Sequence, residues 1–212
     1  MTSTLTRTVR TATMDDLPGV ARVLGRAFHT DPLFLWLFPD DMRRIAQGTR
    51  AGALLAGFTY IPPGYSTLVE AREDADRGPV IRGAALWEPP SGEGRGPAAA
   101  LRSLPHWLEL VGPARFPRVL RYFAELAAHA PREPHWHLHV LGADPAVGRS
   151  GVGSMLLNAG LERADADGAP VYLETMNPAN LGYYERFDFR VVRVLNDSRY
   201  PSTYCLLRDS AA

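Results

Sequence analysis

The chain has 212 residues, 46% of them hydrophobic and 22% charged, which is the composition of an ordinary globular protein. Its 23 basic and 23 acidic residues cancel, and the arginines are scattered along the chain, so a nucleic-acid partner is not expected. The single cysteine, Cys205, excludes an internal disulfide and a metal site built from several cysteines.

Two absences narrow the chemistry and the location. Every basic residue is an arginine, so the protein cannot use a phosphate-loop lysine, a kinase lysine or a Schiff base. The sequence has no run of about 18 apolar residues and no signal-peptide core at its start. We therefore expect a cytoplasmic protein with no membrane partner.

The N-terminal third predicts a strand and two helices. Residues 9–12 have strand character, and Thr13 and Asp16 have the spacing of an acidic capping box before a helix that ends near residue 28. A proline-bounded aromatic segment, residues 31–39, precedes a second predicted helix over 40–58. Its aromatic side chains could fill the core, which is their commoner place, or wall a ligand pocket.

The middle of the chain predicts a hairpin and two more helices. Residues 67–72 and 80–88 have strand patterns joined by a polar turn, so antiparallel pairing is expected. The proline- and glycine-rich stretch 89–97 is typical of a surface loop. Helical patterns follow over 98–111 and 115–130.

From residue 134 onward, strands and helices alternate. Strands are predicted over 135–143, 171–175, 189–195 and 203–208, with helices over 151–167 and 179–187. This alternation favours a mixed α/β or α+β layer in which helices pack on a sheet, and one domain is enough to hold it.

The most specific local feature is the glycine-rich segment 144–154 between a predicted strand and a predicted helix. A phosphate loop fails because Met155 stands where lysine is needed, and a dinucleotide fingerprint fails because Leu156 replaces its third glycine. Two interpretations remain: a cradle of backbone amides for phosphate oxygens, or a tight strand-to-helix connection.

This segment and the downstream Leu-Glu-Thr-Met-Asn-Pro-Ala-Asn-Leu-Gly-Tyr-Tyr-Glu-Arg-Phe-Asp-Phe, residues 173–189, resemble two linked motifs of the GNAT superfamily of acyl-CoA-dependent N-acyltransferases. The layout of the N-terminal part is similar to that of the puromycin N-acetyltransferase type. The resemblance implies the GNAT fold, a mixed central sheet of six to seven strands flanked by helices, with splayed central strands. It implies a single domain over 1–212, with the acetyl-CoA-binding half at about 134–195.

The resemblance also implies where acetyl-CoA, the co-substrate, would bind. The residues carried over for the pyrophosphate are Arg149, Ser150, Gly151, Val152, Gly153 and Ser154. Leu141, Gly142 and Ala143 would hold the pantetheine arm and the thioester carbonyl, and an amide of this strand would stabilise the oxyanion. Gly142 suits that role because a missing side chain permits close approach. Pro145 should end the strand and leave its edge open.

Two residues depart from the family pattern. Gly148 precedes Arg149, where the family begins with Gln or Arg and then Gly. Asp188 replaces the glycine of the terminal Gly-Phe pair, and we expect it to adopt the left-handed backbone that Asp tolerates. Neither change removes a chemical group that the pyrophosphate needs.

His135, His137 and His139 alternate along one predicted strand, so their side chains should share a sheet face. Three interpretations stay open: a metal site, half-buried sheet residues, and a general base or water relay. A metal is not expected, because no carboxylate or Cys follows at metal-site spacing. His137-Leu138-His139 resembles the His-Leu-His of arylalkylamine N-acetyltransferases, which favours the base or relay. Glu88, at the end of the 80–88 strand, is a reserve base.

The second motif supplies the other candidates. Tyr184 aligns with the family's general acid, which protonates the departing thiolate, and Tyr183 is the second choice, expected beside the coenzyme. Only one of the two can face the sulfur, because neighbours on a helix lie about 100° apart. Asn180 matches a position that hydrogen-bonds the coenzyme arm, with N-capping as its alternative role.

The sequence therefore predicts direct transfer of an acetyl group from acetyl-CoA to a primary amine of a small molecule. The acceptor pocket is expected from the segments 29–39, 60–70 and 196–203. Alternatives are a protein or peptide N-acetyltransferase with an open acidic groove, and a non-catalytic acyl-CoA sensor. A homodimer is compatible with the sequence, which does not fix the oligomeric state.

Overall fold

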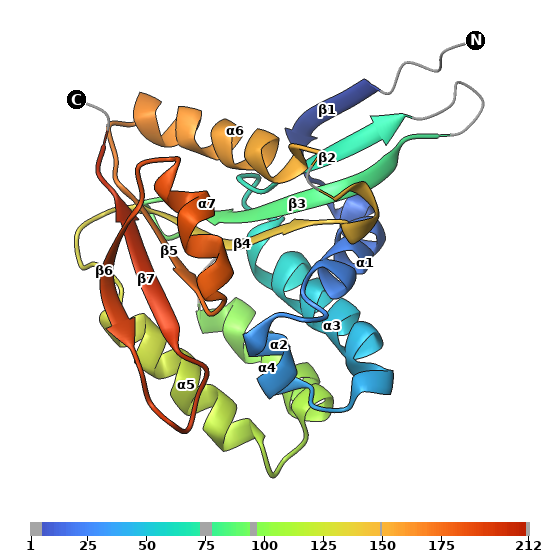
Figure 1. The fold of residues 1–212 in the computed structure, drawn as a ribbon. Coiled ribbons are helices and arrows are strands. Elements are labelled where there is room, and N and C mark those ends of the chain that lie inside the picture. The colour runs from blue at the N-terminus through green and yellow to red at the C-terminus, as the bar shows by residue number, and fades with distance from the viewer. Residues whose placement is uncertain (1–5, 73–77, 94–96, 149, 211–212) are drawn as a thin grey trace.

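The computed structural model describes residues 6–72, 78–93, 97–148 and 150–210 and, within them, builds one seven-stranded sheet with helices on both faces (Figure 1). The strands are β1 (Thr6–Thr11), β2 (Thr67–Arg72), β3 (Val80–Glu88), β4 (Trp136–Ala143), β5 (Val171–Thr175), β6 (Arg190–Leu195) and β7 (Thr203–Arg208). Their order is β1-β2-β3-β4-β5-β7-β6, and only the β4/β5 pair is parallel. The expected mixed sheet is confirmed.

The α-helices are α1 (Leu17–Ala27), α2 (Pro32–Leu37), α3 (Asp41–Leu55), α4 (Pro97–Val111), α5 (Phe116–His129), α6 (Val152–Ala166) and α7 (Leu181–Glu185). The proline-bounded aromatic segment forms α2, capped by the side chain of Asp31, which accepts a hydrogen bond from the Leu33 amide. The helix predicted over 40–58 ends earlier than expected, and a π-helical turn, Ala56–Tyr60, follows it.

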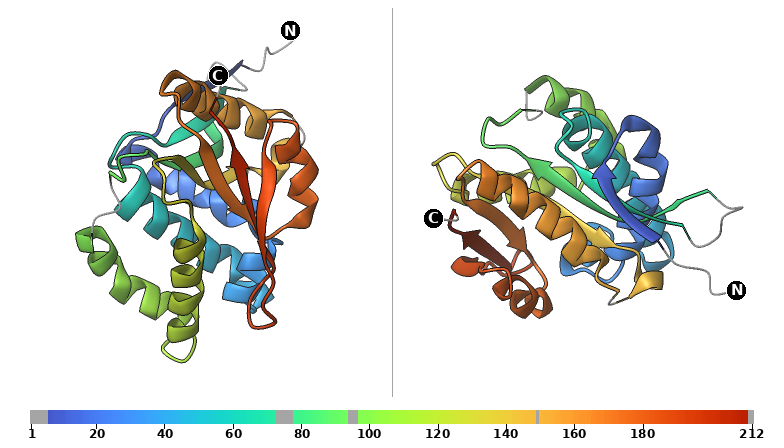
Figure 2. Two further views of the ribbon diagram at one scale, coloured as in Figure 1. Left: turned by 90° about the vertical axis from the view of Figure 1, so that its left-hand side faces the viewer. Right: turned by 90° about the horizontal axis from the view of Figure 1, so that it is seen from above.

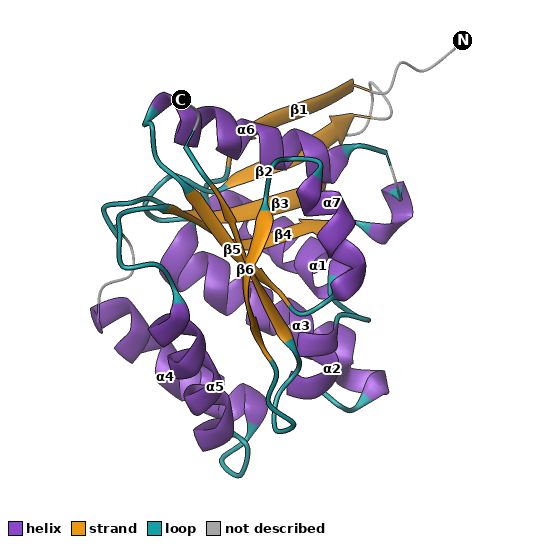
Figure 3. Cartoon of the chain, turned by 60° about the vertical axis from the view of Figure 1, so that its left-hand side comes forward, coloured by secondary structure: helices purple, strands orange, loops and turns teal. Residues whose placement is uncertain are grey.

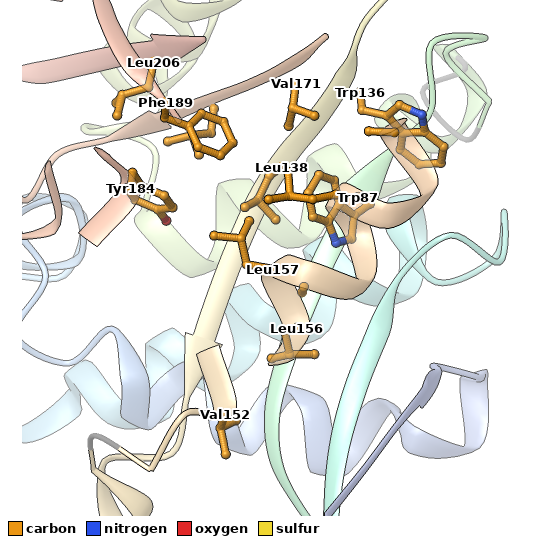
Figure 4. Packing of buried hydrophobic residues seen from close by; sticks show 14 of the residues in the cluster. Trp87, Trp136, Leu138, Val152, Leu156, Leu157, Val171, Tyr184, Phe189 and Leu206 are labelled. Atoms are coloured by element: carbon orange, nitrogen blue, oxygen red, sulfur yellow. The ribbon is translucent and has the colours of Figure 1, made fainter. Parts of the chain in front are cut away.

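The two faces of the sheet are covered by different helices. Seen from above, α6 lies on one side of the first four strands, and α1 lies on the other with α3 outside it (Figures 1 and 2). Between α6 and the sheet, Leu156 and Leu157 meet Trp87 and Leu138 in a fully buried cluster (Figure 4). This apolar layer fixes α6, and with it the glycine loop at its N-terminus, against β3 and β4.

The start of α1 follows the predicted capping pattern. The amide of Thr13 donates to Asp16 Oδ2 at 2.8 Å, and Arg10 on β1 holds the same carboxylate through two bonds of 2.7 Å. These contacts tie the first strand to the helix that covers β3 and β4.

The centre of the sheet splits between β4 and β5. The two strands pair at only three positions, Trp136↔Val171, His137↔Tyr172 and Leu138↔Leu173, and then diverge (Figure 3). β4 nevertheless continues along β3 to Ala143, with a bulge that leaves His139 without a register partner. The expected splay of the central strands is confirmed, and it opens one edge of β4 from His139 onward.

The turn before β6 uses the expected left-handed residue, since Asp188 has a φ of 65°. Within the described ranges, no helix combines the length and the apolar character that crossing a membrane requires.

Candidate active site

A cavity of about 360 Å³ lies at the split between β4 and β5 and is lined by the helices on that face. Most of its wall is apolar, with aromatic rings from α2, α4, α5 and the C-cap of α1. Several segments distant in sequence contribute polar side chains to the wall: Asp31, Tyr60, His137, His139, Glu174, Thr175, Asn180 and Tyr184. A small apolar chamber with a few polar groups is the usual form of a ligand site.

The glycine loop reaches α6 through a left-handed residue. Gly151 has a φ of +84° and serves as the N-cap of α6, a helix of fifteen residues. The first amides of a helix have no partner within it, and the helix dipole favours negative charge there. The loop therefore has the backbone geometry to hold phosphate oxygens. Arg149, one of the predicted contacts, lies outside the described residues.

Ionic contacts to the buried Asp144 hold the connection between β4 and this loop. Asp144 lies 3.2 Å from Arg26 and 3.5 Å from Arg82, and its carboxylate accepts from the Ala146 amide. On the other side, Arg7 Nη1 donates to the Ser150 carbonyl at 2.8 Å. As Pro145 predicted, β4 ends at Ala143.

The hydrogen-bond pattern between β3 and β4 shows which amides of β4 point to its open edge. The Asp144 amide donates to the Arg82 carbonyl, and hydrogen-bonded pairs alternate along an antiparallel ladder. Gly142 therefore directs its amide toward β3, whereas Leu141 and Ala143 direct theirs toward the split. A Cβ on Gly142 would lie 2.9 Å from a methyl of Leu24, so the glycine is explained by packing against α1.

The two tyrosines of α7 point to different places. Tyr184 is 8% exposed and lines the cavity, and burial raises the pKa of its phenol. The hydroxyl of Tyr183 instead lies 3.3 Å from the position of a Cβ on Gly153, at the start of α6. Burial also raises the pKa of Tyr183. The structure thus separates one cavity tyrosine from one glycine-loop tyrosine.

Asn180 lines the cavity rather than capping a helix. Its side chain makes no capping bond, and its amide nitrogen donates to Thr175 Oγ1 at 3.4 Å. Asn177 is the capping residue of this turn, since its side chain accepts from the Ala179 amide.

The histidines gather on one face as predicted, and two of them line the cavity. The rings of His137 and His139 stack with centroids 3.6 Å apart, while His135 contacts His137 at 5.9 Å. His135 Nδ1 bonds to the Glu133 carbonyl, and burial lowers the pKa of His135. His135 does not line the cavity.

Each stacked histidine is bound to a carboxylate. His137 Nε2 lies 2.7 Å from Glu174 Oε2, and His139 Nε2 lies 2.7 Å from Glu88 Oε2. Burial acts to raise the pKa of Glu174, but the neighbouring His137 outweighs it and the pKa is lowered. Sequence reasoning missed Glu174; its only signal was an acidic residue in an otherwise apolar predicted strand beside the histidine strand.

The same residues include a set with metal-ligand character that differs from the predicted histidine trio. Glu88, His137 and His139 each offer one donor atom, all within 4.8 Å of one another. The two imidazole rings of this set are stacked, 28° from parallel.

Asp31 is a second residue that the sequence did not single out. Its carboxylate caps α2 and lines the cavity, and burial raises the pKa of Asp31. It supplies an acidic group in a largely apolar wall.

The predicted pocket walls need correction. Residues 29–39 and Tyr60 do line the cavity, but the 196–203 loop does not; Tyr200, Pro201 and Thr203 line a smaller hollow beside Tyr122. Helices α4 and α5 take its place because they fold under the split (Figure 3). The aromatic cluster has both expected roles: Phe34 lines the cavity, and Phe38 is fully buried.

Comparison with known proteins agrees with this geometry. Residues 108–189 match the model of the acetyltransferase (GNAT) family. A Corynebacterium glutamicum protein described as histone acetyltransferase HPA2 and related acetyltransferase is 26% identical, with a TM-score of 0.69 over 97% of each chain. Arylalkylamine N-acetyltransferase 2 of Aedes aegypti is 10% identical, with a TM-score of 0.63 over 97% of this chain and 99% of that one.

The polyamine N-acetyltransferase of Drosophila melanogaster is 15% identical, with a TM-score of 0.55 over 96% of this chain and all of the other. The chain thus has the fold of the GNAT acetyltransferases and carries a match to their family model across its second half. It is an acetyltransferase that uses an acyl-CoA.

Proposed function

We propose that the protein transfers an acetyl group from acetyl-CoA to the primary amine of a small, largely apolar molecule. One observation carries this proposal: the cavity lies at the split between β4 and β5, with Tyr184 and His139 in its wall and apolar rings around them. A largely apolar cavity of about 360 Å³ has the size and lining of a small-molecule site.

Acetyl-CoA would enter from the glycine loop and extend along the open edge of β4. Backbone amides at Ser150, Gly151, Val152, Gly153 and Ser154 would bind the pyrophosphate, with Arg149 beside them. The amides of Leu141 and Ala143 would bind the pantetheine arm and the thioester oxygen, with Asn180 and Tyr183 along the arm.

The acceptor must lose a proton before it can attack. An alkyl ammonium with a pKa near 10.4 is costly to deprotonate at pH 7, by about 4.6 kcal/mol, so a base in the wall is useful. His139, with His137 behind it, would accept a proton from the ammonium nitrogen, whose electron pair then attacks the thioester carbonyl. Asp31 would favour entry of the cationic amine.

Collapse of the tetrahedral intermediate breaks the carbon–sulfur bond and gives the amide and a thiolate. Tyr184 would donate its phenolic proton to that thiolate, and the second proton lost by the nitrogen would restore the phenol. Burial raises the pKa of Tyr184, so the phenol carries its proton at neutral pH when the thiolate forms. The products are the N-acetyl compound, coenzyme A and one released proton.

A protein or peptide acceptor is the second candidate. It is favoured by the 26%-identical relative whose description includes a histone acetyltransferase. The puromycin type of acceptor, suggested by the sequence, is one member of the small-amine class. Thiol release with a panel of small aromatic and aliphatic amines, compared with peptides, separates the two candidates.

The coenzyme site can be tested with two matched variants of one helix. Gly151 and Gly168 flank α6, have φ values of +84° and +60°, and meet no atom within 4 Å of an added Cβ. Alanine at either position should cost similar backbone strain, roughly 1 kcal/mol. Only Gly151→Ala should weaken acetyl-CoA binding in calorimetry. Equal effects of both variants, or tight binding without turnover of any amine or peptide, would contradict the proposal.

A further inference from the structure

Two buried carboxylates flank the histidine pair from opposite neighbouring strands. Glu88 ends β3 and Glu174 lies on β5, and each binds one imidazole Nε2 at 2.7 Å. All four side chains are largely buried, with Glu88 and Glu174 at 10% and 11% exposure. A charged carboxylate in such a place is stable only with a partner that carries protons or positive charge.

We infer that Glu88 and Glu174 are positioning residues that fix the tautomers of His139 and His137, so that His139 presents Nδ1 as the proton acceptor and His137 supports it from behind. This inference rests on the proposed function. It adds to it which nitrogen takes the proton and which residues hold the ring in place.

The tautomers follow from the acceptor chemistry. An ionised carboxylate can only accept hydrogen bonds, so the Nε2 atom facing it must carry the hydrogen. In a neutral imidazole, Nδ1 then holds the lone pair. Both histidines should therefore be Nε2–H tautomers before the acceptor binds.

The difference in burial between His137 and His139 decides which imidazole can contact the acceptor. His137 Nδ1 has no accessible surface and, among the described residues, no hydrogen-bond partner. It cannot meet an acceptor directly in this arrangement, whereas His139 is the less buried of the two and lines the cavity. The proton acceptor for the amine is then His139, and His137 acts through it.

The bulge in β4 makes this arrangement. In register, Glu88 lies opposite His137, yet its carboxylate binds His139 because the extra residue moves that ring along the strand. Each ring has its own carboxylate, and the two rings stack face to face.

The proton moves directly from the ammonium of the acceptor to His139. The N–H bond of the ammonium breaks, an N–H bond forms at His139 Nδ1, and the electron pair stays on the amine. The positive charge on His139 is opposed by Glu88.

Aromatic rings pack around the stack. The ring of Tyr60 lies 4.6 Å from that of His139, and Tyr172 lies 5.0 Å from His137. Burial raises the pKa of Tyr172 and of the nearby Cys205, and lowers the pKa of His135. Among the described residues, Glu88 and Glu174 are the carboxylates bound directly to the pair.

The tautomers can be read directly by nitrogen NMR of the full-length protein labelled with ¹⁵N-histidine. Glutamine substitutions of single histidines assign the signals. We expect protonated Nε2 and unprotonated Nδ1 in both His137 and His139 at alkaline pH. An Nδ1–H tautomer in either residue overturns the inference, whether or not the protein turns over an amine, so this outcome is distinct from failure of the proposed function.

Kinetics give the second test. In Glu88→Gln, the acid limb of the kcat/KM profile should move to lower pH by about one unit, with the KM for acetyl-CoA unchanged. Glu174→Gln should shift it less, because its ring is the second in line. His135→Gln, on the same strand but outside the cavity, is the matched control and should leave the profile in place. An unmoved acid limb in Glu88→Gln, in a protein that binds acetyl-CoA normally, would refute the inference.

Discussion

The Cβ position of Gly160 lies 2.0 Å from Cζ2 of Trp87, so the indole fills the space that any other side chain on α6 would need. Trp87 is 1% exposed and cannot move outward without breaking the core under α6. We expect Gly160→Ala to lower the free energy of unfolding by about 1–3 kcal/mol, as overpacking does.

Urea unfolding checks this prediction. Gly182→Ala on α7 is the control, because a Cβ there meets no atom within 4 Å. Combining Gly160→Ala with Trp87→Phe should cost less than the sum of the two single variants, since the smaller ring makes room. Strict additivity would show that the indole contact is not the cause.

Tyr184→Phe should lower kcat by about a hundredfold and leave the KM for acetyl-CoA nearly unchanged, because it removes a proton donor that acts late in the reaction. Tyr183→Phe, its neighbour at the glycine loop, is the control and should retain kcat. Burial raises the pKa of Tyr184, so the phenol stays protonated in mildly alkaline solution and should cause no loss of rate there. Equal kcat values for wild type and Tyr184→Phe would remove the residue from the mechanism.

Gly153→Ala should weaken acetyl-CoA binding by about three- to tenfold. The added Cβ would lie 3.3 Å from the Tyr183 hydroxyl, which is tighter than ordinary contact and forces the ring or the first turn of α6 to shift. Calorimetry on the single variant and on Gly153→Ala combined with Tyr183→Phe measures the effect. If the contact is responsible, the double variant recovers part of the affinity; a further loss would place the cause elsewhere.

The contacts of Asp16 predict a contribution to the free energy of unfolding that is lost in acid. Arg10 and the Thr13 amide hold the pKa of Asp16 well below its ordinary 3.8. A lowered folded-state pKa gives stability that is complete above the ordinary value and is lost as the pH falls through the folded-state value.

The difference in unfolding free energy between wild type and Asp16→Asn should therefore be constant from about pH 8 to 5 and shrink below about pH 4. Asp15→Asn, at the exposed neighbouring position, should show no such change. A difference that persists undiminished in strong acid would contradict the assignment.

Most of the fold could be predicted because its signals are local. The strand patterns of β2, β3, β5 and β7 and the left-handed Asp188 depend on the residues themselves or on their nearest neighbours. The early end of α3 was not visible, because the π-helical turn that follows it depends on packing between α1 and α4.

The candidate site was less predictable, since its geometry is set by contacts between distant segments. The histidines were found by their alternation, but Glu174 lies 37 residues from His137 and is joined to it only by strand pairing. The bulge at His139 depends on the register with β3, and no residue type marks it. Asp31 was not singled out, because its place in the cavity wall depends on how α4 and α5 fold against α2.

Because only three residue pairs join β4 to β5, the sheet has two halves with few backbone contacts between them. Strands β1 to β4 pair along most of their length, and so do β5, β7 and β6. Between these two groups, only the three residue pairs of β4 and β5 connect the backbone. An extended ligand bound between β4 and β5 would make contacts with both halves, as an additional strand does. Under the proposed function, release of coenzyme A after transfer would remove these contacts, so the acyl donor and its product would enter and leave by the same gap.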